Sequence, residues 1–65
     1  MELEALIIEL ADGTTVTYSQ EIDKLGDAGP NEIGIFLVTH LDGRLLAAYS
    51  QMTWKSAEYQ YADAA

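Results

Sequence analysis

Residues 3–18 read LEALIIELADGTTVTY, and the Asp12-Gly13 pair separates two runs that favour strands. Asp-Gly is a strong signal for a two-residue hairpin turn, because glycine readily adopts a positive φ. After the turn, Val16 and Tyr18 alternate with threonines, as in a strand with one buried face. The run 3–10 is apolar on both faces, which indicates either burial on both sides or a β-bulge that shifts its register. We therefore predict that residues 3–18 form a β-hairpin.

The second half of the chain carries the same turn signal at Asp42-Gly43. A continuous apolar run over 33–39 precedes this turn and predicts a central strand. Residues 44–50 fit a partner strand, although Leu, Ala and Arg also favour one long helix over 44–63. We favour a strand over 44–50, followed by a C-terminal helix from about residue 54 that Thr53 caps.

Residues 19–31 connect the hairpins and predict one or two helical turns followed by a Gly/Pro loop. Ser19 is a suitable cap, Glu21 complements the positive end of the helix, and Gly26 can close it. The expected fold is α+β: a small antiparallel sheet of about four strands from two Asp-Gly hairpins, a short helix between them and a C-terminal helix. The 65 residues allow a single small acidic domain, residues 1–65.

The composition is strongly acidic, with 11 Asp and Glu against 3 Lys and Arg and a net charge of −8. This charge argues against direct binding to nucleic acid and against electrostatic docking on an anionic membrane. Cysteine is absent, which excludes disulfides, thiolate metal sites and a cysteine nucleophile. Glu2 and Glu4 stand where a signal peptide would be basic, and no apolar run approaches 18 residues, so we expect a cytoplasmic protein.

No sequence pattern indicates catalysis or a bound cofactor. His40 is the single histidine, and no serine lies in a Gly-x-Ser-x-Gly motif. The spacing from Glu21 to Glu32 partly matches a calcium loop, but Leu25 occupies a position that needs an oxygen ligand. We therefore expect no enzyme activity, no catalytic residue, no metal and no cofactor.

The excess of acidic residues lies entirely in residues 1–43, which contain Lys24 as their only Lys or Arg, whereas residues 44–65 are electrically balanced. A rigid array of carboxylates can imitate phosphates and attract the arginines and lysines of a partner protein. This hypothesis makes the partner a basic nucleic-acid-binding protein or effector complex. The candidate partner-binding residues are Glu2, Glu4, Glu9, Glu21, Asp23, Asp27 and Glu32.

In size, acidity and lack of cysteine or catalytic motifs, the whole chain resembles the small phage-encoded inhibitors of the anti-CRISPR and DNA-mimic type. The resemblance involves no motif, so it assigns no residues. It implies a non-catalytic inhibitor in the bacterial host cytoplasm that covers the basic nucleic-acid-binding site of a protein complex. The alternative is a structural or accessory interaction module, such as a homodimer, whose interface uses a C-terminal aromatic surface of Trp54, Tyr59 and Tyr61.

Overall fold

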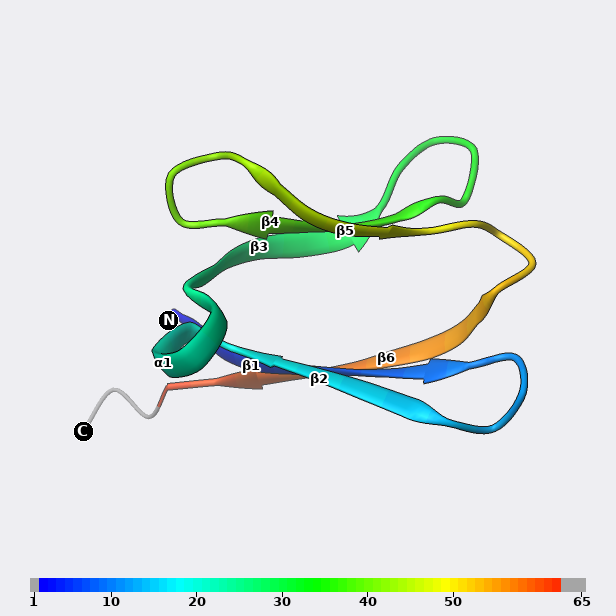
Figure 1. Ribbon diagram of the computed structural model, residues 1–65, viewed down its shortest axis with the longest axis horizontal. Coiled ribbons are helices and arrows are strands. Elements are labelled where there is room, and N and C mark those ends of the chain that lie inside the picture. The colour runs from blue at the N-terminus through cyan, green and yellow to red at the C-terminus, as the bar shows by residue number, and fades with distance from the viewer. Residues whose placement is uncertain (1, 63–65) are drawn as a thin grey trace.

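The computed structural model describes residues 2–62, which form six β-strands and one short helix. The strands make two three-stranded antiparallel sheets, with strand orders β2-β1-β6 and β3-β4-β5. The sheets form two layers, which the chain joins through α1 at one end and through residues 50–53 at the other (Figure 1). The elements are β1 (Leu3–Leu10), β2 (Thr15–Ser19), α1 (Gln20–Asp23), β3 (Leu25–Pro30), β4 (Phe36–His40), β5 (Leu45–Tyr49) and β6 (Trp54–Tyr61).

The predicted α+β fold with a C-terminal helix is wrong, because the C-terminal element is the strand β6 in a two-sheet, mostly β structure. β6 pairs with β1 from Trp54, which is opposite Leu10, to Tyr61, which is opposite Leu3. A register shift between Glu9 and Leu10 leaves Lys55 as an extra residue in β6. Because of the bulge, the core contacts Trp54 and Ala57 are three positions apart in the sequence, a spacing that is also typical of a helix.

Residues 25–30 are also wrongly predicted, because they form β3 and not the end of a helix followed by a loop. β3 pairs with β4, with a register shift between Leu25 and Asp27. At this shift the backbones approach so closely that a Cβ atom on Gly26 would lie 2.8 Å from the carbonyl oxygen of His40. Gly26 therefore permits strand pairing, while the helix closes at Lys24, which has a left-handed φ of 57°.

Both Asp-Gly hairpins and the short helix are present, because their signals are local, but the predicted two-residue turns are wrong. The Gly13 amide donates to the Leu10 carbonyl and the Gly43 amide to the His40 carbonyl, so three residues form each loop. β1 and β2 pair antiparallel, as do β4 and β5, and the turn glycines Gly13 and Gly43 have φ values of 92° and 95°. Ser19 caps α1 by accepting a hydrogen bond from the Ile22 amide at 3.0 Å. The Asp23 carboxylate accepts a hydrogen bond from the Ser19 amide at 2.9 Å, so the two side chains cap the helix reciprocally.

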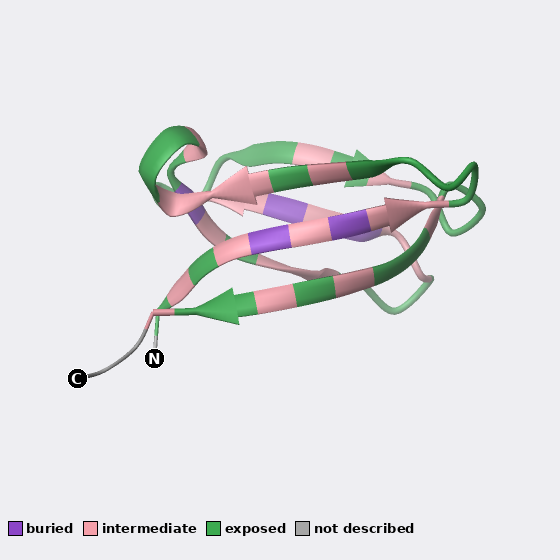
Figure 2. Ribbon diagram, turned by 90° about the horizontal axis from the view of Figure 1, so that it is seen from below, coloured by how far each residue is buried: buried purple, intermediate pink, exposed green. Residues whose placement is uncertain are grey.

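The core lies between the sheets and is small. Its fully buried residues come mainly from the central strands β1 and β4, and Figure 2 marks the buried positions of β1 in the middle strand of its sheet. A bulge between Leu3 and Ala5 shifts β1, so the second of the two predictions for this apolar strand is confirmed. The fully buried residues are Leu6, Ile8, Leu25, Phe36 and Val38.

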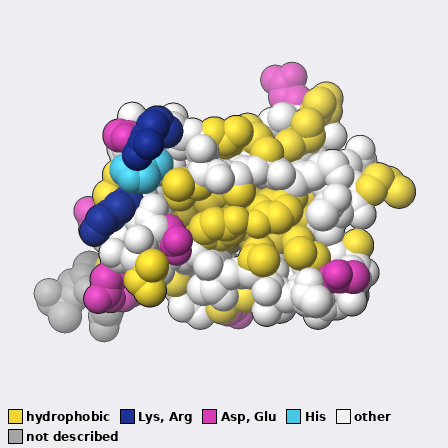
Figure 3. Space-filling model, in the orientation of Figure 1, with side chains coloured by type: hydrophobic (Ala, Val, Ile, Leu, Met, Phe, Trp, Pro, Cys, Tyr) yellow, Lys and Arg dark blue, Asp and Glu magenta, His cyan; other side chains and the backbone are white. Residues whose placement is uncertain are grey.

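At one side of the sandwich the edge strands β2 and β5 are joined through tyrosine hydroxyls. The Tyr18 and Tyr49 oxygens lie 2.5 Å apart. Figure 3 shows hydrophobic side chains gathered between the two layers on this face. Burial, followed by the contact with the Tyr49 hydroxyl, raises the pKa of Tyr18 well above its usual range.

At the other side, aromatic residues of β6 connect the layers. Trp54 donates its indole N–H to the Gly34 carbonyl at 2.8 Å and packs edge-on against Phe36, with ring centroids 4.9 Å apart. The Tyr59 hydroxyl donates a long hydrogen bond of 3.4 Å to the Ala28 carbonyl in β3. β6 therefore contacts the opposite sheet as well as its own.

The two glycines of β3 provide a matched test of the close approach. We expect Gly26→Ala to lower the free energy of unfolding by about 2 kcal/mol, because its Cβ meets backbone atoms that cannot move independently. Gly29→Ala should change it by less than about 0.5 kcal/mol, since its Cβ meets only the Tyr59 hydroxyl, at 3.8 Å. Urea unfolding followed by Trp54 fluorescence measures both. Equal midpoints for the two variants would contradict the backbone contact.

The raised pKa of Tyr18 predicts a loss of stability in alkali. The neutral hydroxyl stabilises the fold below the unfolded pKa of 10.0, and this contribution disappears as the pH rises toward the folded pKa. Tyr18→Phe should therefore be less stable than the wild type at pH 8, by about 1 kcal/mol, and the difference should shrink at pH 11. Urea unfolding at both pH values measures the difference, and a constant or growing difference would contradict the assigned bond.

Candidate functional site

The structure brings five of the seven predicted carboxylates to one end of the molecule. Here α1 contacts the start of β3 and β1, and the Ala62 amide donates a hydrogen bond of 2.8 Å to the Glu2 carbonyl (Figure 1). All five belong to this end because β1 and β3 begin there and α1 lies between β2 and β3. We call it the acidic end, defined by Glu2, Glu4, Glu21, Asp23 and Asp27.

The remaining two predicted residues lie elsewhere. Glu9 is near the far end of β1, which is eight residues long, so about 24 Å separates the two ends of this strand. Its carboxylate accepts a hydrogen bond of 3.2 Å from the Ser56 hydroxyl. Glu32 is exposed in the loop between β3 and β4. The seven carboxylates therefore do not form one continuous array.

The carboxylates of the acidic end form no ion pair with a cation among residues 2–62. The two ion pairs of this part of the chain both involve Asp42. Lys24 donates to the backbone carbonyl of Glu21 at 3.2 Å and not to a carboxylate. Glu2, Glu4, Glu21 and Asp27 are exposed, whereas Asp23 is half-buried and caps α1. The acidic end thus presents charges that remain available to a partner.

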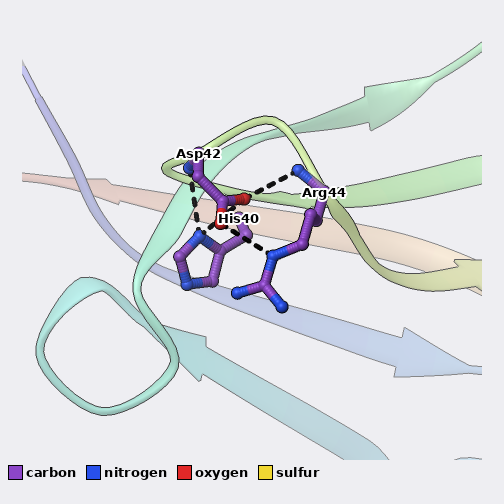
Figure 4. Close-up of polar contacts among 3 residues, drawn as sticks. All are labelled: His40, Asp42 and Arg44. Atoms are coloured by element: carbon purple, nitrogen blue, oxygen red, sulfur yellow. Dashed lines mark hydrogen bonds and ion pairs between the residues drawn. The ribbon is translucent and has the colours of Figure 1, made fainter.

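A small polar network lies next to the acidic end and closes the hairpin between β4 and β5 (Figure 4). Asp42 accepts hydrogen bonds from the Arg44 amide at 2.9 Å and from Arg44 Nε at 2.7 Å. The hydrogen bond from the Arg44 amide is the main reason that the pKa of Asp42 lies below its usual range, and the Arg44 guanidinium adds to this effect.

His40 belongs to the same network. Its Nδ1 lies 3.0 Å from both the amide nitrogen and Oδ1 of Asp42. A neutral ring accepts from the amide, whereas a protonated ring donates to the carboxylate, so either form has a partner. Figure 3 places this histidine beside Lys and Arg side chains, so a small cationic cluster adjoins the acidic end.

No group of three or more His, Cys, Asp or Glu residues within 2–62 is arranged to hold a metal ion. The residues that partly match a calcium loop, Glu21 to Glu32, instead run through α1 and β3 into the loop before β4. The four-residue α1 is the sole helix of the described chain, and no helix there is long and apolar enough to cross a membrane.

The aromatic residues of the alternative interface do not form one exposed surface. Trp54 and Tyr59 are half-buried and pack against the core. Phe36, Tyr59 and Tyr61 form a row from the core outward, with successive ring centroids 6.5 and 6.4 Å apart. Tyr61, at 50% exposure, is the member of this set that solvent reaches most freely.

Sequence reasoning missed two surface features. One is a groove of about 320 Å³ at the acidic end, between β1, β3, β6 and α1, whose lining includes Glu2, Asp27, Tyr59 and Tyr61. No sequence signal could have identified it, because its residues come from distant segments. The other is the free edge of β5, where Leu45 is 60% exposed.

The chain was compared with protein-family models, with curated proteins and with solved structures. No family model, curated protein or solved structure matches it.

Proposed function

We propose that this protein is a non-catalytic binding inhibitor of the DNA-mimic type, whose acidic end docks on the basic nucleic-acid-binding site of a bacterial protein or complex. One observation carries the proposal: four exposed carboxylates gather at one end, and none of them is in an ion pair with a cation of the described chain. Anti-CRISPR activity is one form that such inhibition takes.

The physical argument rests on position and charge. The net charge of −8 attracts a basic partner over a distance, and steering of this kind mainly increases the rate of association. Asp27 lies on β3 and Glu21 on a helix capped at both ends, so binding orders little additional backbone. A basic site covered by these carboxylates cannot bind phosphates at the same time, which makes the protein a competitor of nucleic acid.

Two double variants of equal charge separate the acidic end from net charge alone. Glu21→Lys/Asp27→Lys changes the acidic end, and Glu32→Lys/Glu58→Lys changes two exposed carboxylates outside it. Each immobilised protein is incubated with nuclease-treated bacterial lysate and then washed with duplex DNA. We expect the wild type and the second variant to retain a protein that the DNA elutes, and the first variant to retain at least about tenfold less of it.

Two results of this capture experiment would contradict the proposal. Equal loss in both variants would show that only net charge matters. If the wild type retains no protein that DNA elutes, the proposal that its partner is a nucleic-acid-binding protein is wrong.

A second candidate function is self-association through β5, in place of the C-terminal aromatic surface. β5 is a free edge of its sheet, and Leu45, Leu46 and Ala48 are exposed on it. Unpaired apolar edge strands readily add another strand. Two copies paired at β5 would not bring carboxylates together there, because residues 43–57 contain no Asp or Glu.

Sedimentation velocity over a range of concentrations tests this second candidate. We expect a dimer that Leu45→Lys abolishes, because a lysine on an exposed edge strand opposes pairing with a second edge. Ile33→Lys is the control, since Ile33 is similarly exposed, at 68%, but lies in the loop between β3 and β4. A wild type that stays monomeric, or two variants that behave alike, would rule out the β5 interface.

A further inference from the structure

We infer that the groove at the acidic end is a binding site for a single arginine side chain of the partner protein. This inference rests on the proposed function and specifies the chemical group that the acidic end recognises.

The groove has the dimensions of a site for one side chain. Its volume of about 320 Å³ is at the small end of the range for ligand pockets. β3 contributes only Gly26 and Ala28 beside Asp27, and the lack of bulk at these two positions keeps the groove open. Leu3 and Leu41 add apolar surface, against which the methylene groups of a long side chain can pack.

The charge of the groove selects a cation. Its lining includes two carboxylates, Glu2 and Asp27, and no Lys, Arg or His. Both carboxylates are exposed, and neither forms an ion pair with a cation of residues 2–62. Gln20 adds a side-chain amide to the same lining. A bound cation would therefore find acceptors that no basic group of the described chain already occupies.

The aromatic wall favours a flat cation. The Tyr59 and Tyr61 rings stack with an interplanar angle of 19° and centroids 6.4 Å apart, and the exposure of Tyr61 leaves ring surface open to a ligand. Asp27 lines the same groove as both tyrosines, so its carboxylate lies on the wall next to the aromatic pair.

Arginine fits this combination better than lysine. A guanidinium stacks on a tyrosine face while its N–H groups pair with a carboxylate in a fork, whereas an ammonium is a strongly hydrated point charge. Arginines that bind phosphates in nucleic-acid sites carry the same group. The groove would thus hold one arginine while the remaining carboxylates of the acidic end face the basic surface around it.

The test uses N-acetyl-argininamide, with N-acetyl-citrullinamide as its neutral analogue of the same shape. NMR follows the ring protons of Tyr59 and Tyr61 and the backbone amides, whose spectra also show that each variant is folded. We expect saturable shifts at the groove for the arginine compound, with a Kd on the order of 10 mM, and much smaller shifts for the citrulline compound.

Three variants locate the binding. Asp27→Asn and Tyr61→Leu should each raise the Kd about threefold, by removing a charge pair and a cation–π contact respectively. Glu32→Gln removes one exposed carboxylate outside the groove and should leave the Kd unchanged. Equal binding of the citrulline compound, absence of saturable shifts, or equal effects of Asp27→Asn and Glu32→Gln would overturn the inference.

The outcome is separable from that of the proposed function. If the arginine compound binds in the groove but the lysate experiment retains no DNA-eluted protein, the groove is an arginine site and the proposed partner is wrong. If a DNA-eluted partner is retained but the arginine compound does not bind, the proposed function of the acidic end is supported and the groove is not its arginine site.

Discussion

The pairing of β6 with β1 is the contact on which most of the structure depends. β1 is the central strand of its sheet and supplies two of the five fully buried side chains, Leu6 and Ile8. β6 covers the edge of β1 that β2 leaves open and carries Trp54 and Tyr59 to the opposite sheet. In a domain of 65 residues the core alone buries little apolar surface. The additional contacts between the layers therefore make a large contribution to stability. The same pairing brings Tyr61 beside the start of β1, where the groove lies.

The parts of the fold that could be predicted are those whose cause lies within a few residues. The turns at Gly13 and Gly43 and the cap at Ser19 depend on local backbone preferences, and each is present. The two sheets and the strand character of β6 and β3 depend on distant partners. A bulge at Lys55 interrupts the alternation of buried and exposed residues in β6. Position 26 requires glycine because the His40 backbone packs against it, a contact that only the folded structure shows. Composition indicated a loop at 26–30 because glycine and proline usually mark one. Here these residues lie in β3, an edge strand, where both are tolerated.

In the candidate site, too, the features that the sequence determines locally could be predicted, and those that depend on the fold could not. Charge counting correctly located the acidic excess in residues 1–43, because charge is a property of the sequence itself. Which carboxylates lie together depends on strand length and direction, and so Glu9 and Glu32 are separated from the acidic end. The groove is less predictable still, since Glu2, Asp27 and Tyr61 meet only after both sheets have formed. The aromatic residues of the alternative interface also differ in solvent exposure: Tyr61 is accessible, whereas Trp54 and Tyr59 pack against the core.

The hydrogen bond between the Ala62 amide and the Glu2 carbonyl has a consequence for the topology of the polypeptide. It places residues 2 and 62 side by side, so the backbone between them follows a nearly closed ring. Circular permutation succeeds most often when the original ends are close and the new ones lie in an exposed loop. A permuted polypeptide opened at residues 31–34 would keep every strand pair of both sheets and transfer its free ends to the opposite pole of the molecule. Fluorophores or surface tethers attached there would leave the carboxylate-rich pole unobstructed.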